Sequence, residues 1–284
     1  MIPGHDVAPV LVLGATAQVG HFLVPRLAEA GAPVVAVSRR VPTESRPGVM
    51  WMQQDLQHET ARVQAGTLIS CGPLDLAARQ AHATPGLRRI VALSSASVHF
   101  KRRSGDPVER AVIDELVAAE ERLSDLAEQR GIDFTMLRPT LIYGGPGDRN
   151  VARVRAWIAS RGWAPVCGSG LRQPVHADDL AQLCLRLVPR RGYGLESFDV
   201  GGGESLPYPD FLRRIASAEG RDLRLVRMPA GPVMAVLRLA RAFGALRGIT
   251  PEMVRRQRMD LAVDDTPARE ILDWNPRPFR PAPG

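Results

Sequence analysis

The residues with the clearest chemical meaning lie near the start of the chain, where Val10 to Gly20 reads VLVLGATAQVG. A short apolar run, typical of a buried parallel strand, leads into Gly14, Ala17 and Gly20, and an apolar helix pattern follows at 21–31. This order predicts a turn that binds a dinucleotide pyrophosphate. Gly14 would make the turn, Ala17 would allow close approach, and Gly20 would let the helix pack on the strand. The alternative is an ordinary strand–helix turn with incidental glycines.

The second predicted strand, Pro33 to Ser38, indicates which dinucleotide is bound. Sites that prefer NAD usually place an acidic residue here for the ribose 2′-hydroxyl, whereas this chain has Ser38 followed by Arg39 and Arg40. Arginine pairs with a 2′-phosphate through charge-assisted hydrogen bonds. The pattern therefore favours NADP, with NAD as the second candidate. In the alternative interpretation, the two arginines are solvated turn residues.

The elements that must position these residues alternate between strand and helix. Further strands are predicted at 49–53, 67–70, 89–93 and 134–137, and a long helix at 108–129. This alternation predicts an α/β protein with a Rossmann-type doubly wound parallel sheet, which binds ligands at the carboxyl ends of its strands. We expect a dinucleotide-binding domain over 1–145. A smaller lobe over 146–284 would cover the substrate cleft and could add strands to the sheet.

The amino-acid composition argues against two classes of function, nucleic-acid binding and metal binding. The formal net charge of +7 over 284 residues would suit a polyanion, but Lys101 is the only lysine and the arginines accompany abundant Ala, Gly and Pro. That bias, with no nucleic-acid-binding signature, argues against a nucleic-acid partner. Cys71, Cys167 and Cys184 lie far apart without metal-ligand spacing, so we expect free thiols and no metal site.

Apolar segments give no sign of membrane insertion. No secretory signal is evident, and no uncharged apolar run reaches the roughly 18 residues of a membrane span. We expect a cytoplasmic protein. The most apolar helix candidate, Gly231 to Leu246, is expected to pack or to bind a partner, the alternative being a helix at a membrane surface.

Seven segments, taken in order, carry a family resemblance: GATAQVG, DL, SSAS, LRPTLIYGGPGDRN, QPVHADDLA, FDVGGGESLPYPDFLRRIA and AREILDWNPRPF. Nearly end to end, the chain resembles the extended short-chain dehydrogenase/reductase superfamily, in its NAD-dependent epimerase/dehydratase group. The resemblance implies a nicotinamide dinucleotide, a small-molecule substrate such as a nucleotide sugar, and leaves a homodimer open. With the turn pattern, it assigns the cofactor to Gly14, Thr16, Ala17, Gln18, Val19, Gly20, Ser38, Arg39, Arg40, Asp55, Leu56, Cys71, Gly72, Pro73, Ser94 and Pro139.

The chain departs from this family at the catalytic pair. Relatives carry Tyr-x-x-x-Lys on the helix after the fifth strand, where the tyrosine is the acid/base and the lysine lowers its pKa. Counting back from Glu120 places these positions at Val112 and Leu116, and a shift by one gives Ile113 and Val117. Neither register supplies a tyrosine or a lysine. Proton transfer would therefore need other groups.

Three residues are candidates for that role: Ser95 in the family's serine segment, His99 just after it, and Tyr143 after the sixth strand. Each can instead be structural. On the substrate side, Ser97 is a candidate, and Asn150 and Arg172 match positions in relatives that act on nucleotide sugars. An arginine fork suits a diphosphate.

The residues on the substrate side also have a structural interpretation that involves no ligand. Arg172 and Gln173 could shape a hairpin, and His176, Asp178 and Asp179 could cap the next helix, with Asp178 favoured as the N-cap. Two functions of different class follow for the whole chain. One is an NADP-dependent reductase or epimerase of a nucleotide sugar or small carbonyl compound, with altered proton donors. The other is a non-catalytic dinucleotide binder that serves as a sensor, scaffold or assembly subunit.

Overall fold

The computed structural model describes residues 8–43, 46–192, 194–243 and 250–283. Its centre is a parallel sheet with the strand order β11-β6-β5-β4-β1-β2-β3. Most of these strands are buried along their whole length because helices cover both faces of the sheet. The strands are β1 (Val10–Leu13), β2 (Val34–Ser38), β3 (Val49–Gln53), β4 (Thr67–Ser70), β5 (Arg89–Leu93), β6 (Asp133–Pro139) and β11 (Leu195–Val200).

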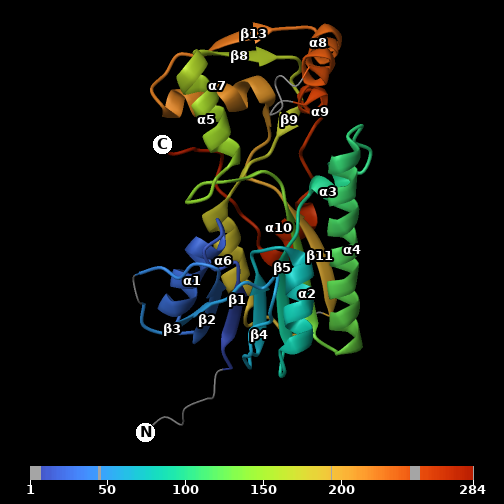
Figure 1. The fold of residues 1–284 in the computed structure, drawn as a ribbon. Helices are drawn as coiled ribbons and strands as arrows, with labels where there is room; N and C mark the ends of the chain where they lie inside the picture. The colour runs from blue at the N-terminus through green and yellow to red at the C-terminus, as the bar shows by residue number, and fades with distance from the viewer. Residues whose placement is uncertain (1–7, 44–45, 193, 244–249, 284) are drawn as a thin grey trace.

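Two helical layers enclose this sheet (Figure 1). Helices α1 (Gly20–Glu29), α6 (Ala177–Leu187) and α10 (Thr266–Leu272) contribute Leu23, Leu183 and Ala268 to the core on one face. Helices α2 (Leu74–Ala83) and α4 (Pro107–Gln129) contribute Ala77 and Leu123 to the core on the other. The parallel sheet with helices on both faces is the Rossmann-type doubly wound α/β arrangement that the sequence predicts.

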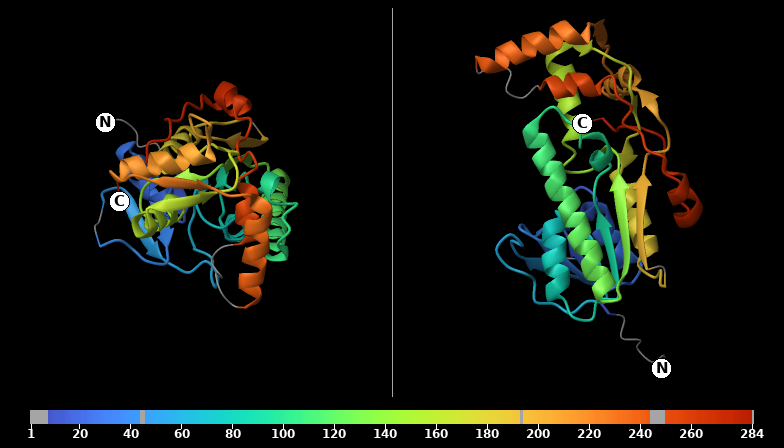
Figure 2. Two further views of the ribbon diagram at one scale, coloured as in Figure 1. Left: turned by 90° about the horizontal axis from the view of Figure 1, so that it is seen from above. Right: turned by 90° about the vertical axis from the view of Figure 1, so that its right-hand side faces the viewer.

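A second lobe lies beyond the carboxyl ends of the sheet strands, toward which the strand arrows point (Figures 1 and 2). It has a core of its own, which includes Ile158, Phe211 and Phe279. Its elements, with the short segments that join it to the sheet, are α3 (Ser97–Phe100), β7 (Ile142–Tyr143), α5 (Asn150–Arg161), β8 (Trp163–Val166), β9 (Leu171–Arg172), β10 (Val175–His176), β12 (Leu206–Pro207), α7 (Tyr208–Ala218), β13 (Arg224–Arg227), α8 (Ala230–Ala242) and α9 (Pro251–Arg256).

The predicted elements agree closely with the observed ones. The strands at 49–53, 67–70 and 89–93 have the predicted bounds, and the long helix begins one residue early, at Pro107, where the Asp106 side chain caps it. Strand β11 from the second half of the chain joins the sheet beside β6. The apolar helix expected at 231–246 is α8, and residues 244–246 lie outside the described residues.

One capping prediction was wrong. His176, not Asp178, is the N-cap of α6: its Nδ1 accepts a hydrogen bond from the Asp178 backbone N–H at 3.1 Å. The Asp178 carboxylate instead binds Arg26 of α1 and Arg277 near the C-terminus, at 2.5 and 2.8 Å. Each oxygen of this carboxylate binds one distant cation, and Asp178 lies inside the first turn of a helix that begins at Ala177.

Candidate functional site

The first strand–helix turn has the compact geometry that its glycines predict. Gly14 has a φ of +65°, and a Cβ there would lie 3.0 Å from the backbone of Cys71 and Gly72. A Cβ on Gly20 would lie 2.2 Å from the carbonyl oxygen of Gly14. The Ala17 N–H donates to that same oxygen at 2.8 Å. Only glycine fits at the two outer positions of the motif, because backbone fills the space on every side.

The start of α1 has no side-chain cap. Its N-cap residue, Val19, makes no side-chain capping bond, and the first turn holds no acidic residue. The N–H groups of His21 and Phe22 donate to the carbonyls of Ala17 and Val19 at 2.8 and 3.1 Å. The partial positive charge of a helix start without an acidic residue favours a phosphate group. Gln18 precedes this helix start, and its side-chain amide donates to the Gly144 carbonyl at 2.9 Å.

The end of β2 is fixed to this turn by two hydroxyl groups. The Ser38 and Thr16 hydroxyl oxygens lie 2.6 Å apart, and the Arg40 N–H donates to the Ser38 hydroxyl at 3.3 Å. Ser38 is buried, whereas Arg39 and Arg40 are exposed. Arg39 and Arg40 thus follow the buried end of β2 as exposed residues, and their role toward a cofactor stays a prediction.

The other predicted cofactor residues follow β3, β4 and β6. The Asp55 carboxylate accepts from the Gln57 N–H at 3.0 Å, next to half-buried Leu56. The Cys71 N–H donates to the Leu13 carbonyl at 2.9 Å, and Pro73 is the N-cap residue of α2. The Pro139 carbonyl accepts from the Ala96 N–H at 2.9 Å, which joins the ends of β5 and β6.

Hydrogen bonds connect residues 94–97, the segment that follows β5, to α4 and β6. The Ser94 hydroxyl donates to the carboxylate of Glu120, which Arg138 also binds, at 2.6 Å for the closest pair of atoms. The carboxylate raises the pKa of Arg138, against the opposing effect of burial. The Ser95 hydroxyl oxygen accepts from the Ser97 N–H at 3.1 Å. Glu120 and Arg138 were not predicted from the sequence to bind this segment. Glu120 had served only to set the register of the helix that became α4.

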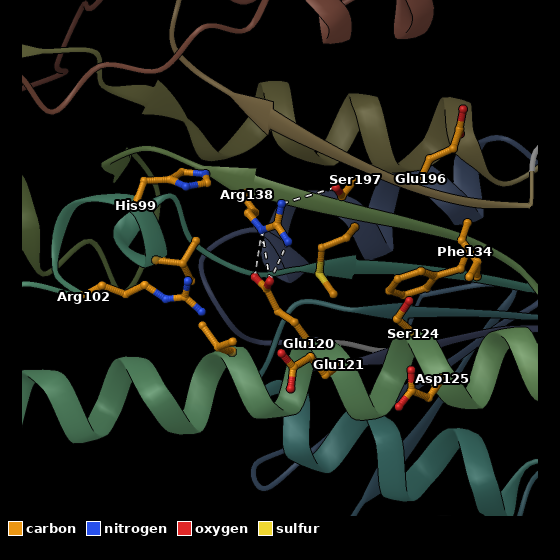
Figure 3. Close-up of a pocket in the computed structure, with 14 residues that line it drawn as sticks. His99, Arg102, Glu120, Glu121, Ser124, Asp125, Phe134, Arg138, Glu196 and Ser197 are labelled. Atoms are coloured by element: carbon orange, nitrogen blue, oxygen red, sulfur yellow. Dashed lines mark hydrogen bonds and ion pairs between the residues drawn. The ribbon is translucent and has the colours of Figure 1, made fainter.

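His99 lies at one end of a groove of about 470 Å³ between α4, β6 and β11 (Figure 3). Its Nε2 is 2.9 Å from a carboxylate oxygen of Asp199 on β11. A carboxylate only accepts, so Nε2 carries the proton in the neutral ring and Nδ1 remains an acceptor. Asp199 was also missed by sequence reasoning, because it lies 100 residues from His99.

Tyr143 belongs to the core of the second lobe. It is only 1% exposed, and its ring packs edge-on against His176 and Phe279, with centroids 4.9 and 4.8 Å away. Its hydroxyl accepts from the Arg280 N–H at 3.1 Å and lies 3.4 Å from the Pro278 carbonyl. Burial raises the pKa of this phenol. The structure therefore places Tyr143 against the C-terminal segment, and a proton-donor role for it stays a prediction.

The two residues that match positions in relatives acting on nucleotide sugars, Asn150 and Arg172, make hydrogen bonds within the protein. The Asn150 amide donates to the Ile142 carbonyl at 3.1 Å. Arg172 is 6% exposed, and its two terminal nitrogens bind backbone carbonyls at Leu171 and Arg256, both at 2.7 Å, with two more contacts at Gly170 and Met259.

The described residues contain neither a membrane-spanning helix nor a cluster of metal-ligand side chains. None of the helices in the described ranges is long and apolar enough to cross a membrane. Within the same ranges, His, Cys, Asp and Glu form no group of three or more that could hold a metal ion. Cys71 and Cys167 are half-buried free thiols and Cys184 is a buried one, as expected.

No protein-family model matches the chain. A (4-alkanoyl-5-oxo-2,5-dihydrofuran-3-yl)methyl phosphate reductase of Streptomyces griseus subsp. griseus is 25% identical to it over 289 residues, which cover 95% of each protein. Among solved structures, MoeE5 in complex with UDP-glucuronic acid and NAD is 20% identical with a TM-score of 0.68, covering 95% of this chain and 94% of that one.

A UDP-N-acetylglucosamine 4-epimerase from Bacillus cereus is 14% identical with a TM-score of 0.64, covering 96% of this chain and 92% of that one. These neighbours agree with the resemblance seen in the sequence and with the parallel sheet described above. The chain therefore has the fold of the extended short-chain dehydrogenase/reductases, the superfamily that includes the NAD-dependent epimerases and dehydratases.

Proposed function

We propose that this protein is an oxidoreductase that uses NADP(H) to reduce or oxidise a small carbonyl compound. The observation that supports the proposal is the turn after β1, where Gly14 and Gly20 leave no room for a side chain and α1 begins without a side-chain cap or an acidic residue in its first turn. Such a turn suits a pyrophosphate that lies close against the backbone.

The residues present fit a dinucleotide with a 2′-phosphate. The turn would hold the pyrophosphate, and Arg39 and Arg40, exposed beyond the Ser38–Thr16 contact, would hold the 2′-phosphate. When bound, the cofactor supplies or accepts a hydride. The chain's own residues must then orient the substrate and move a proton.

Ser95 and His99 are the groups best placed to handle that proton. Because the Ser95 oxygen accepts from the Ser97 backbone, its own O–H remains able to donate to a substrate oxygen. His99 has Nδ1 as a free acceptor while Asp199 engages Nε2. We assign Ser95 to bind the reacting oxygen and His99 to exchange a proton with it, directly or through water.

The curated relative favours reduction over epimerisation. Its name describes a reductase whose substrate is a phosphorylated furanone, and it matches this chain over nearly its whole length. We therefore place a small carbonyl compound ahead of a nucleotide sugar as the substrate of this chain.

A second function, non-catalytic dinucleotide binding, is favoured by the predicted positions of the family's catalytic pair. Val112 is 58% exposed, and Leu116 is half-buried one turn later on α4. Neither side chain can transfer a proton or hold a ribose hydroxyl.

Turnover of NADPH separates the two functions. NADPH oxidation is followed with a panel of small ketones, aldehydes and unsaturated lactones. The oxidoreductase proposal expects turnover that falls by about a hundredfold or more in Ser95→Ala. No turnover in the wild type, together with gain of activity in the double variant Val112→Tyr and Leu116→Lys, would support the binding protein instead. Turnover that is unaffected by Ser95→Ala and by His99→Ala would contradict our assignment of both groups.

A further inference from the structure

The guanidinium of Arg172 is enclosed by the protein itself. Its Nη1 donates to the carbonyls of Gly170, Leu171 and Met259 at 3.2, 2.7 and 3.0 Å, and its Nη2 donates to the carbonyl of Arg256 at 2.7 Å. The ring of Tyr208 lies 4.9 Å from the guanidinium carbon. Both terminal nitrogens therefore already have backbone partners.

Two of these carbonyls belong to a segment that we call the strap, residues 251–261, which begins with α9. The strap lies directly on the loop before Arg172. The Gly170 N–H donates to the Gln257 carbonyl at 2.8 Å, and the Cys167 N–H donates to the Gln257 side chain at 2.7 Å. The Leu261 N–H donates to the Leu171 carbonyl at 2.9 Å.

The contact between strap and loop leaves no gap for a ligand. A Cβ on Gly170 would lie 2.2 Å from the Met259 carbonyl oxygen, and one on Gly168 would lie 2.7 Å from the Gln257 carbonyl oxygen. The glycines of this loop therefore accommodate the chain's own backbone at van der Waals contact.

The strap is held at its other side by α4. Arg256 donates to both carboxylate oxygens of Glu109, at 2.8 and 2.7 Å. Glu109 also accepts from the Ser104 hydroxyl at 2.8 Å. The strap thus bridges the Arg172 loop and the start of α4, and moving it would break contacts at both ends.

Arg172 remains a charged hydrogen-bond donor in this arrangement. Burial lowers its pKa to about 10, so the guanidinium remains charged at neutral pH. Hydrogen bonds from a charged donor are the stronger class in proteins, and here they are sheltered from water. A diphosphate at Arg172 would have to displace several of them at once.

We propose that Arg172 is a clamp for the strap and not a ligand for a diphosphate, so that the substrate of this chain is a small carbonyl compound without a nucleoside diphosphate. The inference rests on the proposed function for the reaction, but the clamp itself depends only on the contacts above. Asn150, the other residue that matches relatives acting on nucleotide sugars, is exposed, and its side-chain amide donates to the Ile142 carbonyl.

The substrate half of the proposal is tested by titrating UDP-glucose into the full chain by calorimetry, with and without saturating NADPH. We expect no saturable heat up to about 1 mM UDP-glucose. Saturable binding below that concentration would overturn the inference. NADPH binding is measured in the same experiment, so failure of the cofactor proposal is visible separately from failure of this one.

The clamp half is tested by limited trypsin digestion, because the strap contains cleavable bonds after Arg255, Arg256 and Arg258. Arg172→Met should speed cleavage in the strap by about tenfold or more, since local opening exposes it. The matched control is Arg161→Met, because Arg161 also lies over an aromatic ring, that of Trp157 at 5.0 Å, but away from the strap. Equal cleavage rates in wild type and Arg172→Met would overturn the clamp.

Discussion

The turn after β1 and the segments around Arg172 and Tyr143 were both predicted from motif residues, but they are built in different ways. In the turn, Gly20 is confined by the nearby backbone of Gly14 and Ala15, and Gly14 by the backbone that follows the neighbouring strand β4. Arg172 and Tyr143 are fixed by partners far along the chain, at sequence separations of 84 and 135 residues. A motif read from local sequence thus predicts a backbone shape better than it predicts what a side chain will bind.

The largest effect is expected where the backbone leaves no space. Gly20→Val would force a side chain against the Gly14 carbonyl, which a Cβ would already approach to 2.2 Å. We expect a loss of about 2–3 kcal/mol of stability, a fall in melting temperature of about 5–10 °C, and loss of NADPH binding.

Calorimetric titration and thermal melts check that expectation. The control is Gly231→Val, because a Cβ on Gly231 meets no atom within 4 Å. Wild-type melting and NADPH affinity in Gly20→Val would show that the phosphate turn has been placed wrongly.

A smaller effect on stability is expected at Asp178 of α6, whose carboxylate binds Arg26 of α1 and Arg277 of the C-terminal segment. Burial alone would raise the pKa of Asp178, but the two guanidinium groups outweigh burial and hold it below its ordinary value. Asp178→Asn should cost about 2 kcal/mol at pH 7, since both arginines are partly exposed and can be hydrated once released.

The pH dependence of this cost has a definite sign. A lowered carboxyl pKa stabilises the fold above the unfolded value of about 3.9, and the stabilisation disappears as the pH falls through the folded value. The difference in melting temperature between wild type and Asp178→Asn should therefore shrink below about pH 4. The control is Asp210→Asn, which removes an exposed pair with Arg213. A difference that stays constant down to pH 2 would rule out the ion pair as the cause.

The smallest effect is expected at Tyr143. Because its hydroxyl binds the backbone near Pro278 and Arg280, Tyr143→Phe should cost about 1 kcal/mol of stability and leave turnover unchanged. Urea unfolding and NADPH oxidation measure the two quantities. A hundredfold fall in turnover with unchanged stability would restore Tyr143 as a proton donor.

The same contrast explains how much of the molecule the sequence could predict. Strands such as Val49–Gln53 and Arg89–Leu93 have the predicted bounds, because runs of apolar residues between turn residues determine them locally. The cap of α6 was assigned to Asp178, but the helix begins at Ala177, so His176 is the N-cap and the Asp178 carboxylate binds Arg26 and Arg277 instead. The Asp199 partner of His99 and the strap over Arg172 depend on tertiary contacts that no local pattern encodes.

The central claim is that the turn, with Arg39 and Arg40 beyond it, forms an NADP(H) site. Its most direct test is calorimetric titration of the wild-type protein with NADPH and with NADH under identical conditions. We predict that NADPH binds at least about tenfold more tightly, because the 2′-phosphate gains charge-assisted hydrogen bonds from arginine, and that Arg39→Asp removes this preference. Equal affinities, or tighter binding of NADH by the wild type, would contradict the account.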